Sequence, residues 1–258
     1  MSRALHAEWT KQRTVAGPAW LLLATIALTV ALSVIVTLAT TYASSAAAQD
    51  LPRLSLTGVY LGQAIVAILA VMTITDEYSS RMIQITLCAI PARPTMLAAK
   101  AAIVTALVLV AGTVAVLGCM LAGRLILPAG GFTAAHGYAA VSLGDGPTLR
   151  AAFGSVLYLA LIGLLSLGIG TAVRDSAVAI GLVLGLLYLF PIVAHLVGSQ
   201  HLERHLEQIG PMTAGLAIQA TTNLRALPIA PWAGLGVLAA WAAASLLAGG
   251  VLLKLRNA

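Results

Sequence analysis

Residues 76–100 read DEYSSRMIQITLCAIPARPTMLAAK and separate two long apolar runs. Wound as a helix at about 100° per residue, residues 78–90 gather their polar side chains into one stripe, Ser80, Arg81, Gln84 and Cys88. Pro91 and Pro94 end that helix, because proline lacks the backbone N–H and clashes with the preceding turn. The stretch therefore predicts a short amphipathic helix that lies on a bilayer surface or docks into another protein. An ordinary loop between two spans is the alternative.

The composition is that of a membrane protein. Hydrophobic residues make up 60% of the 258, charged residues only 9%, and the mean hydropathy is +0.99. A soluble domain has a charged fraction of about a quarter, so that class is excluded. The net charge of +6 does not indicate nucleic-acid binding, because the basic residues are scattered and form no patch interleaved with aromatic residues.

The apolar sequence falls into six runs that are long enough to cross a bilayer, which takes about 20 residues. We therefore expect an all-α polytopic membrane protein with one transmembrane domain over residues 18–254. Its second span emerges at Asp76–Glu77, and the chain re-enters the membrane near Lys100. The expected spans are residues 18–43, 55–75, 97–127, 149–173, 177–197 and 231–253.

Two further segments are expected outside the spans. Residues 1–17 are polar and basic and place Leu5 and Trp9 one helical turn apart, which predicts an amphipathic helix at the membrane interface. Residues 198–230 begin with alternating charged and apolar residues, and residues 211–220 are apolar but too short to cross. This exterior loop is expected to hold an interfacial helix, followed by a segment that is either re-entrant or lies on the surface.

The basic residues predict the orientation. With both termini inside, nine of the fourteen Lys and Arg residues are cytoplasmic and five are exterior. Because basic loops stay on the cytoplasmic side, we expect a multi-pass protein of the cell membrane with both termini in the cytoplasm.

Two pairs of glycines have the small-xxx-small spacing, Gly58 with Gly62 and Gly181 with Gly185. Small residues at this spacing let two helices approach closely in a membrane. We expect both pairs to be helix-packing positions.

The phosphate-loop motif G-x-x-x-x-G-K-[ST] is absent from the sequence. Gly210 and Gly215 have the glycine spacing of a phosphate loop, but Leu216 and Ala217 stand where lysine and a hydroxyl residue are needed. The chain is therefore not expected to bind ATP through such a loop or to be an enzyme.

Neither a metal site nor ion coupling is expected. His201, Glu203 and His205 form H-x-E-x-H, which differs from the H-E-x-x-H of zinc proteases. The spans hold almost no ionisable groups, whereas ion-coupled carriers keep such groups near the middle of the membrane. Energy for any transport is expected to enter from another subunit.

The sequence resembles the ABC-2-type permeases, the membrane subunits of bacterial ABC exporters. Residues 4–14 (ALHAEWTKQRT) are similar to the amphipathic N-terminal helix of that family. Residues 76–100 resemble its cytoplasmic coupling segment, of the form E-x-x-x-G-T-x-x-x-x-L-x-x-x-P-x-R…K. Arg81 and Met82 depart from the pattern where glycine and threonine are usual. The residues on the pattern are Glu77, Leu87, Pro91, Arg93 and Lys100.

The resemblance covers nearly the whole chain, since GIGTAVRDSAVA (168–179), IGPMTAG (209–215) and LLKLRNA (252–258) are also similar to the family. It implies a six-span permease that pairs with a second permease and with a cytoplasmic ABC ATPase subunit that binds ATP and Mg. The coupling helix would seat in the ATPase. The residues expected to couple are Glu77, Arg81, Gln84, Ile85, Leu87, Pro91 and Arg93.

The expected function is export of hydrophobic or amphipathic cargo, such as a drug, lipid or antimicrobial peptide. The expected partners are the ATPase subunit, a second permease and the lipid membrane, with no nucleic acid. The chain itself is expected to bind no cofactor. A carrier or channel that works without nucleotide, and a membrane scaffold or sensor that does not transport, are the alternatives.

Overall fold

The computed structural model describes residues 16–42, 49–79, 93–196 and 200–255, and every regular element within these ranges is a helix. Six helices are long and apolar enough to cross a membrane, which confirms an all-α polytopic membrane protein. They are α2 (Ala16–Ala39), α4 (Val59–Ser79), α6 (Arg93–Ile126), α7 (Gly146–Val173), α8 (Ser176–Leu196) and α11 (Pro231–Leu255).

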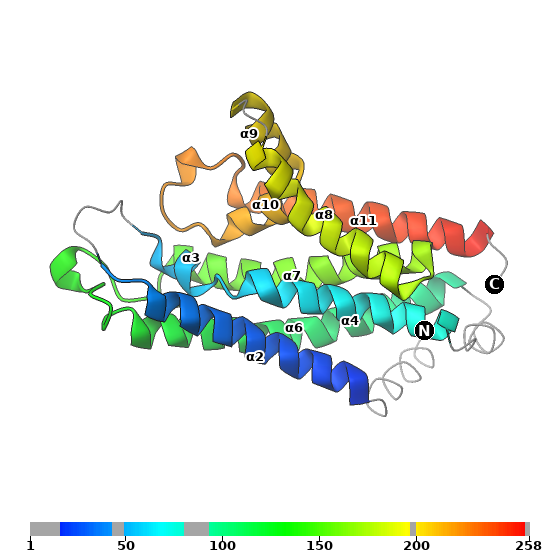
Figure 1. Cartoon of the computed structure of the whole chain (residues 1–258), viewed down its shortest axis with the longest axis horizontal. Helices are drawn as coiled ribbons and strands as arrows, with labels where there is room; N and C mark the ends of the chain where they lie inside the picture. The colour runs from blue at the N-terminus through cyan, green and yellow to red at the C-terminus, as the bar shows by residue number, and fades with distance from the viewer. Residues whose placement is uncertain (1–15, 43–48, 80–92, 197–199, 256–258) are drawn as a thin grey trace.

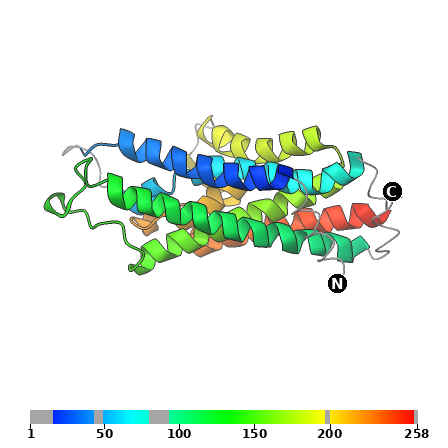
Figure 2. The same cartoon turned by 90° about the horizontal axis from the view of Figure 1, so that it is seen from below.

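The six long helices lie side by side along the long axis of the molecule (Figures 1 and 2). The first residue of α2 and the last residue of α11 lie at one end of the bundle, together with the end of α4 and the beginning of α6. We name this the termini end. The opposite end, named the loop end, holds α3 (Leu51–Ser55) and the connection from α6 to α7, which includes the 3-10 helix η1 (Ala134–His136).

Two helices form the centre of the bundle, and the others cover them. In α7, 67% of the most apolar stretch is buried within the chain, and in α4 61%, against 17% in α8. Figure 1 shows that α8 is inclined to the other helices and diverges from them toward its C-terminal end. The exposed faces of α2, α8 and α11 are apolar, as helices in contact with lipid or with another membrane protein require.

Hydroxyl and small residues bring α2 close to its neighbours. The stripe consists of residues four apart that are at most 1% exposed: Thr25, Thr29, Ser33 and Thr37. Gly58 and Gly62 lie against this stripe, and a Cβ placed on Gly58 would come within 1.8 Å of the Thr29 carbonyl oxygen. Only glycine permits this approach, so the packing role expected of the Gly58–Gly62 pair is confirmed.

The second glycine pair does not pack within the chain. A Cβ placed on Gly181 or Gly185 would meet no other heavy atom of the described residues within 4 Å. Both glycines lie on the outer side of α8, beside Leu182 and Leu189, which are more than half exposed. No other described helix packs on these two glycines, because α8 diverges from the bundle along this face, and their role in helix packing stays a prediction.

The long connection between α8 and α11 has two parts. Its first helix, α9 (Gln200–Ile209), is amphipathic and largely exposed, as expected of an interfacial helix. The next helices, α10 (Pro211–Leu216) and η2 (Ala217–Gln219), are buried among α7, α8 and α11. Gly154 of α7 makes room for the Ile218 side chain, which would lie 2.0 Å from a Cβ at that position. We name α10 and η2, residues 211–219, the inserted segment, because they pack between helices of the bundle; whether the segment is re-entrant stays a prediction.

Candidate functional site

The termini end holds a buried ion pair that joins α4 to α6. The Lys100 ammonium group lies 2.7 Å from Oε1 of Glu77, and the two side chains are 0% and 2% exposed. Lys100 also donates to the carbonyl oxygen of Thr73, at 3.3 Å, one turn earlier in α4. Burying a charged side chain without a partner costs several kcal/mol of folding free energy. Removal of either Glu77 or Lys100 would therefore leave the other charge buried and uncompensated.

Glu77 and Lys100 lie on the two sides of segment 80–92, the heart of the predicted coupling helix. Glu77 is in the last turn of α4 and Lys100 is in the second turn of α6. The ion pair therefore holds together the two helices from which segment 80–92 departs. Lys100 stands on the family pattern quoted above, but its partner could not be read from that pattern.

A second contact at the same end joins α4 to the turn between α7 and α8. The Arg174 guanidinium lies over the Tyr78 ring, 5.2 Å from its centroid. Arg174 ends α7 in a left-handed conformation, with φ of 66°. The adjacent Asp175 accepts a hydrogen bond from the backbone N–H of Val178 at 2.8 Å, which caps the start of α8. These two residues form the short connection between the helices expected at 149–173 and 177–197.

Two predicted boundaries of the coupling segment are corrected. The second span was expected to emerge at Asp76–Glu77, but α4 continues to Ser79 and buries Glu77. The Glu77 carboxylate that α4 buries is neutralised by the ion pair with Lys100. At the other side α6 begins at Arg93, so Pro94 lies in its first turn, where a missing N–H is tolerated.

The other predicted coupling residues lie outside the described part of the chain. These are Arg81, Gln84, Ile85, Leu87 and Pro91, and for Arg93 only the backbone is described. Residues 1–15, which hold most of the predicted N-terminal helix, also lie outside it.

Buried polar side chains connect the centre of the bundle to the inserted segment. The Tyr158 hydroxyl donates to the side-chain oxygen of Gln63, whose amide nitrogen lies 3.2 Å from the sulfur of Met212. Deeper toward the loop end, the amide of Gln219 donates to the Ser155 hydroxyl at 3.1 Å. Helices α4, α7 and the inserted segment are therefore joined by side-chain hydrogen bonds in an apolar surrounding.

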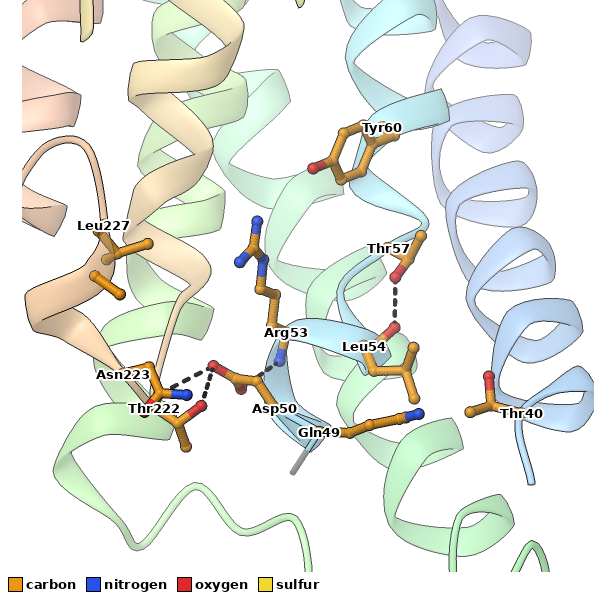
Figure 3. A pocket seen from close by; sticks show the side chains of 11 residues that line it. Thr40, Gln49, Asp50, Arg53, Leu54, Thr57, Tyr60, Thr222, Asn223 and Leu227 are labelled. Atoms are coloured by element: carbon orange, nitrogen blue, oxygen red, sulfur yellow. Dashed lines mark hydrogen bonds between the residues drawn. The ribbon is translucent and has the colours of Figure 1, made fainter. Parts of the chain in front are cut away.

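The loop end holds a cavity of about 730 Å³, named here the loop-end cavity and shown in Figure 3. It lies between the end of α2, the α3–α4 corner and the connection that follows the inserted segment. Its lining residues are Thr40, Gln49, Asp50, Arg53, Leu54, Thr57, Tyr60, Thr222, Asn223, Ala226 and Leu227.

Asp50 lines this cavity and connects α3 to residues 221–222, which are distant in the sequence. Its carboxylate accepts hydrogen bonds from the backbone N–H and hydroxyl of Thr221, both at 2.6 Å, and from the backbone N–H of Thr222 at 3.0 Å. It also caps α3 by accepting from the backbone N–H of Arg53 at 3.1 Å. The carboxylate is thus satisfied by donors of the chain itself.

Several of these residues were not singled out from the sequence. The hydroxyl stripe of α2 has a readable signal, since Thr25, Thr29, Ser33 and Thr37 recur every four residues. No local pattern identifies Gln63, Tyr158 or Arg53, because their neighbours come from distant parts of the chain. His201 and His205 lie with ring centroids 4.4 Å apart on α9, and within the described ranges no group of three possible metal ligands occurs.

Comparison with known proteins adds no identification. No protein-family model matches the chain, and no curated protein matches its sequence. The likeness to ABC-2-type permeases therefore rests on the residues quoted in the sequence analysis.

Proposed function

We propose that the chain is the permease subunit of an ATP-driven exporter in the cell membrane. A separate cytoplasmic ATPase subunit binds ATP and Mg, and a second permease, identical or related, completes the transport path. The cargo is hydrophobic or amphipathic. This chain supplies membrane helices of the transport path and segment 80–92, which contacts the ATPase and is displaced when the ATPase changes conformation.

The observation that carries the proposal is the buried Glu77–Lys100 ion pair beside segment 80–92. A coupling segment must transmit displacement to helices that move as bodies. With α4 and α6 joined by a buried ion pair, displacement of segment 80–92 moves both helices. Because α4 packs on α7 and α2, the displacement would reach the centre of the bundle.

The distribution of charge supports an external energy source. Among the described residues, the only buried charged side chains are Glu77 and Lys100, and they neutralise each other at the termini end. A carrier driven by an ion gradient uses ionisable groups near the middle of the membrane. The other buried polar side chains of the described residues are neutral, among them Gln63, Ser155 and Ser166.

The proposal is tested by affinity purification from detergent-solubilised membranes of the native cell. The chain is compared with a variant carrying Arg81→Asp, Gln84→Ala and Ile85→Asp, and bound nucleotide-binding subunits are identified by photolabelling with azido-ATP. We expect an ATPase subunit to copurify with the unaltered chain and not with the variant. Arg204→Asp on α9, which projects from the bundle away from the termini end (Figure 1), is the control and should retain the subunit.

Two results would contradict the proposal. If the chain purifies alone and moves solute into liposomes under an ion gradient, it is a nucleotide-independent carrier. If the ATPase binds the variant as well as it binds the unaltered chain, segment 80–92 is not the coupling element.

A further inference from the structure

We propose that the loop-end cavity is a binding site for the oxyanion group, a phosphate or a carboxylate, of an amphiphilic molecule, and that Arg53 holds that group. The inference goes beyond the proposed function and does not depend on it, because binding can be measured on this chain alone.

Arg53 is oriented toward the cavity by the local structure. Its backbone N–H is used in capping α3, by donating to Asp50. Its side chain extends in the opposite sense, away from the Asp50 carboxylate and toward Tyr60 and Leu227 (Figure 3). The guanidinium therefore points along the cavity toward the bundle and not outward past α3.

The positive charge of Arg53 has no counter-ion within the described residues. No described carboxylate forms an ion pair with the guanidinium. The nearest acid along the chain, Asp50, is engaged by the backbone N–H groups of Thr221 and Thr222 and by the hydroxyl of Thr221. A guanidinium presents five N–H donors in a planar fork that matches the oxygens of phosphate and carboxylate, so an oxyanion is its complementary ligand.

The remaining lining suits a molecule with one polar and one apolar part. Thr57, Tyr60 and Asn223 contribute polar side chains to the lining, whereas Leu54 and Leu227 contribute apolar ones (Figure 3). The volume of about 730 Å³ falls within the range of roughly 300–1,000 Å³ typical of small-molecule sites. An acyl or other apolar group can lie against the leucines while its charged group reaches Arg53.

The alternative is that Arg53 is a solvated surface arginine with no ligand of its own. Arg225 provides the matched comparison, because it is exposed, as Arg53 is, and does not line the cavity, although its neighbours Asn223, Ala226 and Leu227 do. If anions are only attracted to the basic surface in general, both arginines should contribute to binding. If the cavity is a specific binding site, only Arg53 should contribute.

The test measures binding of dioctanoyl phosphatidylglycerol to the purified full chain in dodecyl maltoside, by isothermal titration. We expect Arg53→Gln to weaken binding about tenfold or more, since a charge-assisted contact is lost, and Arg225→Gln to leave it unchanged. Dioctanoyl phosphatidylcholine, which is zwitterionic, should bind the unaltered chain less tightly. Equal thermal unfolding midpoints for both variants confirm that each is folded.

The source of the anion is distinguished by competition with glycerol 1-phosphate. Competition supports the site and indicates that a water-soluble anion suffices. Binding of the lipid without such competition supports the site and indicates that an amphiphile with its apolar chain is needed. The proposal is overturned if Arg53→Gln binds like the unaltered chain, if Arg225→Gln loses as much affinity, or if neither probe binds.

Discussion

At the scale of single residues, the Glu77–Lys100 pair decides how α4 and α6 meet. Both side chains are almost completely buried, with their charged atoms 2.7 Å apart, and Ile74, Met96 and Leu97 of the same two helices are buried as well. A buried pair of this kind contributes little net stability compared with an apolar pair of the same volume. Its effect is on specificity: one register of α4 against α6 places the two charges together, and other registers separate them.

Removal of one partner is therefore expected to destabilise the protein strongly. Lys100→Met leaves the Glu77 carboxylate buried without its cation, which costs about 3–5 kcal/mol. The midpoint of thermal unfolding in detergent should fall clearly. The double variant Glu77→Gln with Lys100→Met removes both charges of the pair and should recover most of the loss. A single variant as stable as the unaltered chain would show that the ion pair does not hold α4 to α6.

A buried hydroxyl in the centre gives a second prediction at this scale. Tyr158 is fully buried and donates its hydroxyl to Gln63. Tyr158→Phe leaves the Gln63 oxygen without that donor, at a cost of about 1–3 kcal/mol. The matched control is Tyr138→Phe at the loop end, where the partly buried hydroxyl only accepts a 3.3 Å bond from Gln49. The midpoint of thermal unfolding should fall more for Tyr158→Phe than for Tyr138→Phe. Equal midpoints would show that the hydrogen bond between Tyr158 and Gln63 does not stabilise the protein more than the peripheral one.

At the scale of elements, close helix approach is concentrated where α2 meets the α3–α4 corner. Gly62 lies against the Thr29 side chain, and Gly58 lies against its backbone. In a membrane the association of helices depends on such van der Waals contact and not on apolar burial alone. The same glycine spacing in α8 has no neighbouring helix within the described chain, which shows that the spacing permits close packing but does not cause it.

Substitution of the two kinds of glycine should have different outcomes. Gly62→Leu inserts a side chain where Thr29 Oγ1 lies 2.3 Å from the Cβ position, so α2 must shift, at about 1–3 kcal/mol. Gly181→Leu meets no atom of the described chain and should leave the unfolding midpoint of the monomeric chain nearly unchanged. If both variants lose stability equally, the difference in packing environment is not the cause.

The inserted segment is the element whose placement the sequence left open. It consists of α10 and η2, residues 211–219, and is too short to cross the membrane alone. It packs against α7 and α11, where Ile218 lies against Gly154 and Ala214 lies against Gly234. Its position brings Met212 and Gln219 into hydrogen-bonding distance of Gln63 and Ser155.

At the scale of the whole molecule, an even number of spans puts the α2 start and the α11 end at one end of the bundle (Figure 1). The excess of basic residues on that side predicts that it faces the cytoplasm. The turn between α7 and α8, with exposed Ser176, lies at the termini end, and the connection containing exposed Asn223 lies at the loop end.

Cysteine labelling in intact cells tests this orientation. In a background with Cys88 and Cys119 replaced by Ala, Asn223→Cys should react with a membrane-impermeant maleimide. Ser176→Cys should react only after the membrane is permeabilised. Ala214→Cys, at a fully buried position of the inserted segment, should stay unreacted in both conditions. The reverse pattern would place the termini outside and would remove the basis for a cytoplasmic coupling segment.

The amino-acid sequence by itself determined the class of the protein, the number of spans and their approximate limits. Long apolar runs are sufficient for this, because a lipid bilayer requires each crossing segment to satisfy its own backbone hydrogen bonds. The interfacial helix α9 and the turn at Arg174–Asp175 also follow from local sequence, since each depends on residues near one another in the chain.

Only the tertiary structure decided which charges pair, which glycines pack and where a cavity forms. Glu77 and Lys100 are 23 residues apart, and Asp50 and Thr221 are 171 apart. No periodicity within one helix encodes such contacts. They depend on the rotation and register of whole helices against one another, and these are set by the combined packing of side chains from many segments.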